Sequence, residues 1–587
     1  MCGIIGYIGN ENASPIIFEA LKRMEYRGYD SAGIATFDGD FIIKKGAGKV
    51  KQLDEKLNFS QMQGTVGIGH TRWATHGNVS EDNAHPHWSC KAEVVVVHNG
   101  IIENYNGLRS FLVTRGHKFK SQTDSEVIAH LLEEATKNFG DLKEALLSTV
   151  ASLKGSYSFL AILKDKPETL IAVRKDAPMI VGVGKNEYFL ASDVLAFIDR
   201  TNSAIFLDNR EIALVTRTGL TFFDFAGAPV IKSPTTVAWE IGDVSKNQFL
   251  HYTLKEIHEQ PTSIRQTLMQ EQSEIARFAN TIRQTKNFFI TGCGTSYNAG
   301  LLLKYLLAKK AKIRSDVFLS SEIDQHKDLM NRDAVLLAIS QSGETADVLE
   351  AVTEAKSRGA TILSIVNVMG SSLTRESELT LFTRCGPEVG VAATKSFTSQ
   401  VALLYLISSF VASRSSNDLS GLASSIEQVL GVEKLVSDIA AKYVNANDFY
   451  FIGRGDHYPV AIEGALKMKE LSYVHAEGMA AGELKHGTLA LIEDGTPVVL
   501  VNPPDETYTP TLNNAMELRS RGAKIIGLSA TNHPSYDEFI PLPKLQLKYL
   551  YPIVEVIPLQ LMAYYAAIGR KLDPDYPRNL AKSVTVI

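Results

Sequence analysis

Residues 334–345 read AVLLAISQSGET, an apolar run that leads into a loop of hydroxyl and amide side chains. The run Ala334–Ile339 has the length and composition of a fully buried strand, and residues 346–357 show helical periodicity. A strand, a short loop and a helix form the repeating unit of a doubly wound parallel sheet. Hydroxyls and free backbone N–H groups ahead of a helix bind phosphate well. The side chains expected to do so are those of Ser340, Ser342 and Thr345; the alternative is that this loop only caps the helix.

A second loop of the same chemistry lies nearer the N-terminus. Residues 289–294, FITGCG, have the pattern of a strand that enters a Gly-rich turn, and Thr295 and Ser296 follow it. Two hydroxyl-bearing loops after strands favour phosphate binding over simple capping. The third glycine of a dinucleotide fingerprint is missing, and no Gly-Lys-Ser/Thr closes the loop, so neither a dinucleotide site nor a Walker loop is expected.

The C-terminal half contains an internal repeat with an offset near 162 residues. FITGCG at 289–294 resembles FIGRG at 451–455, and SRGA at 357–360 recurs at 520–523. A constant offset predicts a duplicated α/β module. In the second copy NPPDET at 502–507 stands where the first has SQSGET, so both serines are lost and two prolines, which lack an N–H, are gained. The phosphate site is therefore expected in the first copy only.

The N-terminal half has a different texture. Short apolar or alternating runs such as Gly3–Ile8 and Val94–His98 are separated by turn signals, and helical patterns cover 15–24 and 125–137. These features predict an α+β domain with antiparallel sheets. The expected organisation is an α+β domain over 2–218, a connector over 219–247, α/β domains over 277–417 and 440–577, and a tail over 578–587 whose apolar residues suit packing over a site.

Composition excludes several classes of protein. The 587 residues are 45% hydrophobic, and Lys plus Arg number 60 against 65 Asp plus Glu, so no basic excess points to nucleic acid. The four cysteines are too sparse for a disulfide scaffold and favour a reducing compartment, the cytoplasm. The apolar run Val401–Ala412 is too short to span a bilayer, so no membrane partner is expected.

One short cluster has metal-ligand side chains. His85, Pro86 and His87 are followed by Cys90, but the second half of a zinc signature is missing. The sequence therefore predicts no metal site and no cofactor.

The N-terminal half also carries residues suited to nucleophilic catalysis. Removal of Met1 would give Cys2 a free α-amine, whose usual pKa of about 7.7–8.0 suits a general base beside the thiol. Arg72 can bind a carboxylate through two hydrogen bonds, and Asp124 can hold an α-ammonium group. An amide side chain followed by glycine, Asn99-Gly100, suits an oxyanion hole. Singly, each has a plainer explanation: a cysteine that happens to be second, a surface ion pair, a helix cap and a turn.

Longer motifs extend this reading to a known family. CGI at 2–4, EYRGYDSAG at 25–33, HTRWATHG at 70–77 and HNGIIENY at 98–105 resemble the N-terminal-nucleophile (class II) glutamine amidotransferases. ITGCGTS at 290–296, ISQSGET at 339–345, EGALKMKELSY at 463–473, GELKHG at 482–487 and PRNLAKSVTV at 577–586 resemble a tandem pair of sugar-isomerase (SIS) domains. The combination is that of the isomerising glutamine–fructose-6-phosphate aminotransferases, and it covers essentially the whole chain.

The resemblance implies a fold and a reaction. The fold is an αββα N-terminal-nucleophile domain followed by two flavodoxin-like α/β SIS domains. The reaction converts glutamine and fructose 6-phosphate to glutamate and glucosamine 6-phosphate, the first step of amino-sugar synthesis. Ammonia would pass between the two halves, and a homodimer is expected.

The resemblance also implies residue roles in glutamine cleavage. Cys2 is the nucleophile, and Asn99 and Gly100 form the oxyanion site. Trp73 is the expected gate of the ammonia channel. The glutamine-binding residues are Arg72, Thr75, His76 and Asp124.

Further implied roles lie in the sugar half. Glu463, Lys467 and Glu470 stand at i, i+4 and i+7 on one face of a predicted helix, a pattern that by itself also fits a solvated ion-pair stripe. The family role of Glu470 is proton transfer between C1 and C2, and Lys467 stabilises negative charge. His486 helps to open the sugar ring, and Lys582 forms an imine with the ketose. The sugar-phosphate-binding set is Ser296, Ser340, Gln341, Ser342, Thr345 and Glu463.

Other functions fit less well. Phosphoribosyl transfer needs a pyrophosphate loop with paired acids, and asparagine synthesis needs a Ser-Gly-Gly loop; neither is found in the sequence. A sugar-phosphate deglycase has no use for Cys2. A SIS-type sensor has no use for Glu470 and Lys582.

Overall fold

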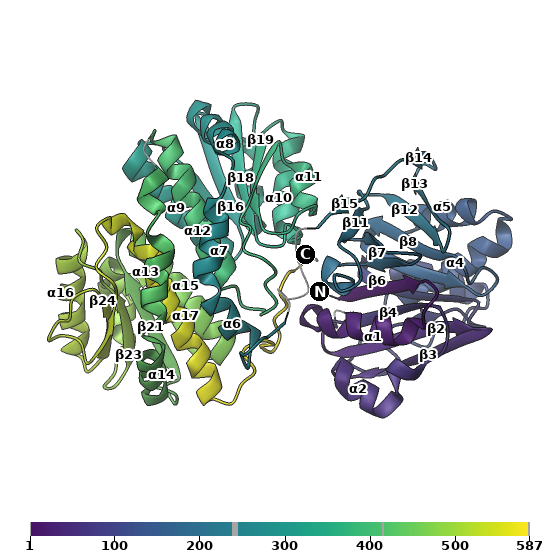
Figure 1. The fold of residues 1–587 in the computed structure, drawn as a ribbon, viewed down its shortest axis with the longest axis horizontal. Coiled ribbons are helices and arrows are strands. Elements are labelled where there is room, and N and C mark those ends of the chain that lie inside the picture. The colour runs from purple at the N-terminus through teal and green to yellow at the C-terminus, as the bar shows by residue number, and fades with distance from the viewer. Residues whose placement is uncertain (1, 75, 238–244, 414–415, 585–587) are drawn as a thin grey trace. The chain divides into compact units, whose positions relative to one another are not determined.

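The computed structural model describes residues 2–74, 76–237, 245–413 and 416–584 (Figure 1). The chain forms two compact units, Met1–Ser245 with Ser583–Ile587, and Lys246–Lys582. Thr75, one of the expected glutamine-binding residues, lies outside the described residues.

Two antiparallel sheets build the first unit. The eight-stranded sheet has, in order, β15 (Thr235–Thr236), β11 (Ser203–Phe206), β9 (Ile180–Val183), β10 (Tyr188–Ala191), β1 (Gly3–Ile8), β4 (Val66–Arg72), β2 (Ser31–Asp38) and β3 (Asp40–Ala47). The seven-stranded sheet has β14 (Pro229–Val230), β13 (Gly219–Asp224), β12 (Glu211–Thr216), β8 (Leu170–Lys175), β7 (Gly155–Leu163), β6 (Val94–Ile102) and β5 (His87–Trp88).

Strand β6 shows why these sheets stack. Successive side chains of a strand point to opposite faces. Val95 and Val97 enter the apolar core that β6 shares with residues of β1 and β4 in the other sheet, whereas Val94 and Val96 pack against helices on the outer face. A run that is apolar at every position is therefore buried on both sides.

Helices cover the outer faces of both sheets (Figure 1). Helix α1 (Ala13–Arg23) packs on β1 and β4, and α2 (Val50–Leu57) on β2 and β3. The other sheet carries α4 (Glu126–Asn138), which contacts α3 (Tyr105–Thr114) and α5 (Leu142–Ser152). This α–β–β–α layering confirms the predicted α+β fold.

The connector expected over 219–247 was wrong in its first part. Strand β13 pairs with β12 along its whole length, β14 pairs with β13, and β15 pairs with β11. The prolines suggested a connector because proline cannot donate to a ladder, but Pro229 begins a two-residue edge strand, where that donor is not needed.

Two five-stranded parallel sheets build the second unit, with the same strand order. The first has β17 (Asp316–Leu319), β16 (Asn287–Gly292), β18 (Ala334–Ser340), β19 (Thr361–Val366) and β20 (Leu379–Phe382). The second has β22 (His475–Ala480), β21 (Asp448–Gly453), β23 (Pro497–Val501), β24 (Lys524–Ser529) and β25 (Glu538–Pro541). This matching topology confirms the predicted duplication.

These sheets pack, through one large apolar core and smaller apolar clusters, against the helices that surround them (Figure 1). They are α6 (Tyr252–His258), α7 (Gln260–Leu268), α8 (Gln272–Gln284), α9 (Thr295–Ala311), α10 (Ala346–Ser357), α11 (Ser372–Glu376), α12 (Lys395–Val411), α13 (Leu422–Leu430), α14 (Glu433–Lys442), α15 (Tyr458–Ser472), α16 (Tyr508–Arg519) and α17 (Tyr551–Gly569). Among the described residues one segment, Lys548–Gly569, is long and apolar enough to cross a membrane. Of its most apolar window 83% is buried in the structure, so it packs as a core helix.

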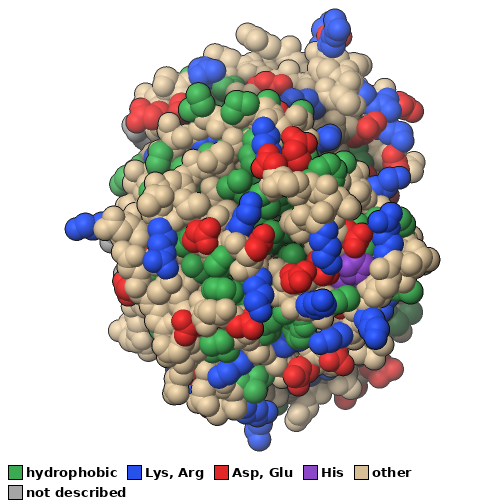
Figure 2. All heavy atoms as spheres, turned by 90° about the vertical axis from the view of Figure 1, so that its right-hand side faces the viewer, with side chains coloured by type: hydrophobic (Ala, Val, Ile, Leu, Met, Phe, Trp, Pro, Cys, Tyr) green, Lys and Arg blue, Asp and Glu red, His purple; other side chains and the backbone are tan. Residues whose placement is uncertain are grey.

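Charged side chains of both signs are interspersed on the face shown in Figure 2. This mixture agrees with the near balance of 60 basic and 65 acidic residues.

Candidate functional site

Cys2 lies directly before β1, with hydrogen-bond donors around it. The backbone N–H of Trp73 donates to Cys2 Sγ at 3.2 Å, and Asn99 Nδ2 donates to the carbonyl oxygen of Cys2 at 3.0 Å. Burial raises the pKa of the Cys2 thiol, although the Trp73 N–H and the charge of Arg72 oppose that rise. The thiol therefore needs a base to become a nucleophile.

The side chain of Asn99 is held by a histidine that sequence reasoning missed. His70 Nε2 lies 3.1 Å from Asn99 Oδ1 and 2.9 Å from the backbone oxygen of His98. Both neighbours are acceptors, so Nε2 carries the proton. Burial lowers the pKa of His70 to about 3, so the imidazole is neutral. The register β1–β4–β2 brings His70 of β4 opposite Ile4, which a strand pattern alone does not reveal.

Gly100 follows Asn99 in β6 with a φ of 112°. A Cβ atom at this position would lie 2.1 Å from the backbone oxygen of Ser156 on the neighbouring strand. Only glycine fits this left-handed, crowded position. Its identity is thus set by the backbone, in agreement with a role for its N–H rather than for a side chain.

Arg72 and Asp124 are both 3% exposed. Arg72 donates to the backbone oxygens of His76 and Asn78, so it fixes the loop after β4. Asp124 accepts from the N–H of Ile102, at the end of β6, at 2.7 Å. Burial lowers the pKa of Arg72, while the charges of Cys2, Asp30 and Asp124 oppose that shift.

The structure therefore places Cys2 and Asp124 each within electrostatic reach of Arg72. Two other expected residues, Trp73 and His76, lie on the loop after β4. His76 packs edge-on against Tyr105 at 5.6 Å between ring centroids, and Trp73 packs edge-on against Tyr29 at 5.6 Å.

The serine-rich loop in the second unit follows β18 and precedes α10. Ser340 Oγ accepts from the N–H of Gly343 at 3.0 Å, and Ser342 Oγ accepts from the N–H of Glu344 at 3.1 Å. Ser340 Oγ also lies 3.4 Å from Thr345 Oγ1. Gly343 has a φ of 65°, which lets the chain turn back on itself. These contacts gather the hydroxyls at one turn ahead of the helix.

Two further expected residues lie close to this sheet edge. Ser296, in the first turn of α9, is buried and accepts from Gln400 Nε2 of α12 at 3.0 Å. The backbone oxygen of Gln341 accepts from the N–H of Asn367 at 3.0 Å, which ties the loop to the end of β19.

The three charged residues of α15 form a network in which Glu463 and Lys467 are buried and Glu470 is half-buried, not a solvated stripe. Lys467 Nζ lies 2.5 Å from Glu470 Oε2 and 3.4 Å from Glu463 Oε1. Glu463 also accepts from Thr295 Oγ1 at 3.0 Å and from Asn298 Nδ2 at 2.8 Å. Thr295 and Asn298 belong to α9, so the network joins the two repeats.

Burial and charge act in opposite directions in this network. Burial alone lowers the pKa of Lys467, but the charges of Glu463 and Glu470 outweigh it and raise that pKa. Burial raises the pKa of Glu463, against the attraction of Lys467. Sequence reasoning named Thr295 as part of the hydroxyl-bearing loop at 290–296, but missed its contact with Glu463 and missed Asn298.

Lys582 is not a flexible solvated end. Its side chain is 5% exposed, and Nζ lies 2.5 Å from Glu388 Oε2 and 2.8 Å from the backbone oxygen of Gly390. Glu388 also accepts from Ser396 Oγ at 2.7 Å. Burial alone raises the pKa of Glu388, but Lys582 and Ser396 bring it down to about 2. Glu388 was missed because 194 residues separate it from Lys582.

His486 stands apart from these groups. It ends a short 3₁₀ segment, Ala481–His486, and is exposed. No hydrogen bond joins it to Glu463, Lys467 or Glu470 within the described part of the chain.

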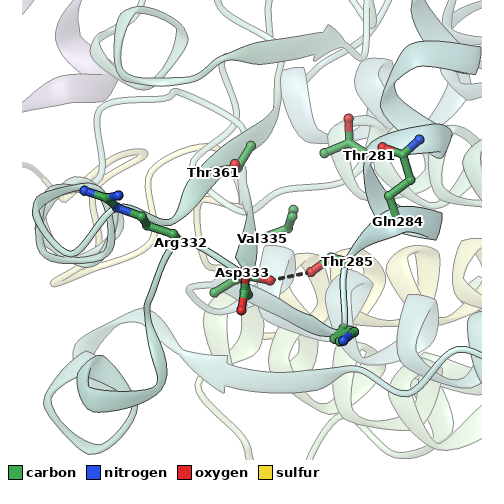
Figure 3. A pocket seen from close by; sticks show the side chains of 9 residues that line it. Thr281, Gln284, Thr285, Arg332, Asp333, Val335 and Thr361 are labelled. Carbon is green, nitrogen blue, oxygen red and sulfur yellow. Dashed lines mark hydrogen bonds between the residues drawn. The ribbon is translucent and has the colours of Figure 1, made fainter.

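A cavity of about 300 Å³ lies at the amino-terminal ends of strands β18 and β19 in the first parallel sheet (Figure 3). Asp333 and Val335 flank the start of β18, and Thr361 starts β19. Thr285 Oγ1 donates to the backbone oxygen of Asp333 at 2.9 Å. Ligands of open parallel sheets bind at the carboxyl ends of strands, so this cavity is not the sugar-phosphate site.

Comparison with known proteins agrees with this geometry. Residues 70–199 match the glutamine amidotransferase domain family, and residues 281–409 and 442–570 each match the SIS domain family. The C-terminal domain of a glucosamine-fructose-6-phosphate aminotransferase from Francisella tularensis is 36% identical with a TM-score of 0.53, covering 56% of this chain and 99% of that one.

Full-length relatives extend the match to the whole chain. Glutamine–fructose-6-phosphate aminotransferases (isomerizing) are 46% identical in Pyrococcus horikoshii and 44% in Methanothermobacter thermautotrophicus, with 100% of both chains covered in each case. With a half-buried thiol at Cys2 in one unit and two SIS domains in the other, the chain belongs to the family of isomerising glutamine–fructose-6-phosphate aminotransferases.

Proposed function

We propose that this chain transfers the amide nitrogen of glutamine to fructose 6-phosphate, giving glutamate and glucosamine 6-phosphate. The observation that carries the proposal is the placement of Cys2 between the Trp73 N–H and the Asn99 amide, in a chain whose other unit has a hydroxyl-lined loop. The names of the full-length relatives support the same reaction.

Glutamine cleavage begins at Cys2. After removal of Met1, the α-amine accepts the thiol proton, and the thiolate attacks the side-chain amide of glutamine. One N–H of Asn99 Nδ2 is committed to the Cys2 carbonyl, so the other N–H and the Gly100 N–H stabilise the oxyanion. The tetrahedral intermediate collapses to a thioester and ammonia, and water then releases glutamate. Arg72 and Asp124 provide charges that match the α-carboxylate and the α-ammonium group of glutamine.

Sugar chemistry takes place in the second unit. The hydroxyls of Ser340, Ser342 and Thr345 bind the phosphate, and Lys582 attacks the ketose carbonyl to form an imine with loss of water. Lys582 must first lose a proton, and its partner Glu388 is the nearest carboxylate. Ammonia then displaces the lysine amine from C2. Glu470 moves a proton between C1 and C2 while Lys467 balances the negative charge that develops.

The finer points of assembly are part of the same proposal. His486 is exposed in its own chain, which suits donation to the sugar site of a second copy in a homodimer. Ammonia crosses between the units uncharged, with Trp73 as the gate. The expected location is the cytoplasm.

The test is product identification with labelled glutamine. The full chain is incubated with fructose 6-phosphate and glutamine labelled with ¹⁵N in its amide, and the products are analysed by mass spectrometry. We expect labelled glucosamine 6-phosphate and an equal amount of glutamate. The proposal is wrong if the sugar product carries no label or does not form.

A matched variant separates the two halves of the reaction. Cys2→Ala is expected to abolish glutamine hydrolysis and to leave the isomerisation of sugar phosphate intact. Cys385→Ser, which alters a buried thiol far along the chain, serves as the control. Glutamate release by Cys2→Ala at the wild-type rate would remove Cys2 from the mechanism.

A further inference from the structure

Four metal-ligand side chains meet in the first unit, away from Cys2. Cys90 lies in the turn between β5 and β6, His117 follows α3, and His130 and Glu133 lie on α4. One ligand atom from each lies within 4.8 Å of all the others. His117, His130 and Glu133 are buried, whereas Cys90 is exposed and leaves an entry path from solvent.

Most of the separations lie near those of ligands around a tetrahedral ion, and the widest pair would close up on binding from at most 4.8 Å. His117 Nδ1 and His130 Nδ1 are 3.0 Å apart, and Cys90 Sγ lies 3.7 and 3.8 Å from them. Glu133 Oε2 lies 3.5 Å from His117 Nδ1 and 4.0 Å from His130 Nδ1. Zinc bonds of about 2.0–2.3 Å place tetrahedral ligand atoms about 3.3–3.7 Å apart.

The far nitrogens of both rings face carboxylates. His117 Nε2 lies 3.1 Å from Glu134 Oε1, and His130 Nε2 lies 3.5 Å from Glu126 Oε1. Each carboxylate favours the tautomer with the proton on Nε2, so both Nδ1 atoms present lone pairs to each other. Such carboxylate partners are usual behind histidines that bind zinc.

The fourth ligand atom belongs to a carboxylate whose other oxygen is already paired. Glu133 Oε1 pairs with Lys137 at 2.8 Å, but the buried Glu133 Oε2 has no hydrogen-bond partner among the described residues. A buried carboxylate oxygen without a donor is costly. The Lys118 N–H donates to Cys90 Sγ at 3.3 Å, which suits a thiolate. A cation at the centre would satisfy four Lewis bases that otherwise face one another.

We propose that Cys90, His117, His130 and Glu133 bind one zinc ion. Mixed sulfur, imidazole and carboxylate ligands suit Zn²⁺ rather than Mg²⁺ or Ca²⁺. Binding replaces the Cys90 thiol proton, which passes to solvent, and involves no change of oxidation state. Four protein ligands leave no open position, so the ion is structural.

The zinc site links three segments of the first unit. It ties α4 to the β5–β6 turn and to the segment after α3. Asp124 precedes α4 and accepts from Ile102, the last residue of β6. The ion thus secures the elements that carry Asp124, Asn99 and Gly100.

The test uses the full chain, purified without a histidine tag and freed of metal with a chelator. The probes are Zn²⁺ and Co²⁺ salts. We expect close to one equivalent of tightly bound zinc by elemental analysis. Cobalt is expected to give visible bands of tetrahedral Co²⁺ and a near-ultraviolet thiolate-to-metal band.

Variants separate this site from chance binding. Cys90→Ser should remove the thiolate band, and His130→Gln should remove stoichiometric binding. Cys385→Ser and the exposed His475→Gln should keep both. Circular dichroism identifies any variant that fails to fold. The proposal is overturned if the wild-type protein gives no tetrahedral cobalt bands, or if the thiolate band survives Cys90→Ser.

Discussion

At the scale of single residues, Asn99, the proposed oxyanion-hole amide, has its orientation set by two hydrogen bonds. Its Oδ1 is fixed by the neutral His70 imidazole, and its Nδ2 donates to the Cys2 carbonyl. The amide cannot flip without losing both hydrogen bonds. One N–H is therefore held ready in a buried site, where such a donor has its greatest effect on developing charge.

Removing that amide should slow glutamine cleavage. We expect Asn99→Ala to lower the kcat of glutamate release by about 10²–10³-fold, because one oxyanion donor is lost. The KM for glutamine should change little, since Arg72 and Asp124 remain. Steady-state glutaminase assays measure both constants, and Asn106→Ala, an exposed asparagine on α3, is the control. A kcat within twofold of the wild-type value would contradict the oxyanion role.

At the scale of an element, α15 is unusual because it buries charge at a junction. Glu463 and Lys467 are fully buried, and their partners Thr295 and Asn298 lie on α9. A buried ion pair repays its desolvation only if its geometry and hydrogen bonds are good. The network therefore joins the two repeats and holds a charge at their junction.

Replacing Lys467 should destabilise the charged network of α15. Lys467→Met leaves Glu463 and Glu470 without a cation, so we expect a loss of about 3–5 kcal/mol in the free energy of unfolding. Sugar turnover should be lost as well. Urea unfolding and product assays measure the two effects, with Lys469→Met, an exposed lysine on the same helix, as the control. Equal stability of the two variants would show that the network is dispensable.

At the scale of the whole molecule, the two copies of the duplicated fold differ in the loop that follows their central strand, β18 or β23. The second repeat keeps the left-handed glycine before its first helix, Gly455 with φ 54° against Gly294 with φ 50°. In the loop after β23, however, Asp505 lies 2.8 Å from His457, which also lies 2.9 Å from Glu555. Asn502 and Pro504 of this loop stand where the first repeat has Ser340 and Ser342, and Asp505 is paired with His457, which supports a phosphate site in the first repeat alone.

This triad makes stability depend on pH. Burial alone lowers the pKa of His457, but Glu555 and Asp505 raise it to about 10. The unfolded value is about 6.5, so the stabilisation is complete below about pH 6.5 and is lost as pH rises toward 10. Asp505, whose pKa falls to about 2 through its hydrogen bond with His457 despite burial, adds stability that is lost only in strong acid.

Thermal melts across this range test the triad. The Tm of the wild type should fall between about pH 7 and 10, and His457→Gln should have a lower Tm at pH 7 and a flatter profile. The exposed His475→Gln should follow the wild type. If His457→Gln and the wild type lose Tm in parallel as pH rises, His457 is not the titrating group.

The sequence alone determined the elements and the repeat. Strand β1 and helix α10 have the predicted bounds, because apolar periodicity and turn chemistry are local properties. It also supplied the motifs around Cys2 and Ser340. The end of the first unit was harder to predict, since a proline in an edge strand and a proline in a connector give the same signal.

Only the tertiary structure decided which distant side chains meet. Cys90 was read with its neighbours His85 and His87, yet its sulfur faces His117 and His130. Lys582 contacts Glu388, which is 194 residues away in the sequence, and Glu463 contacts Asn298, which is 165 residues away. Spacing along a chain encodes which face of an element a residue occupies, whereas the packing of strands and helices decides what that face touches.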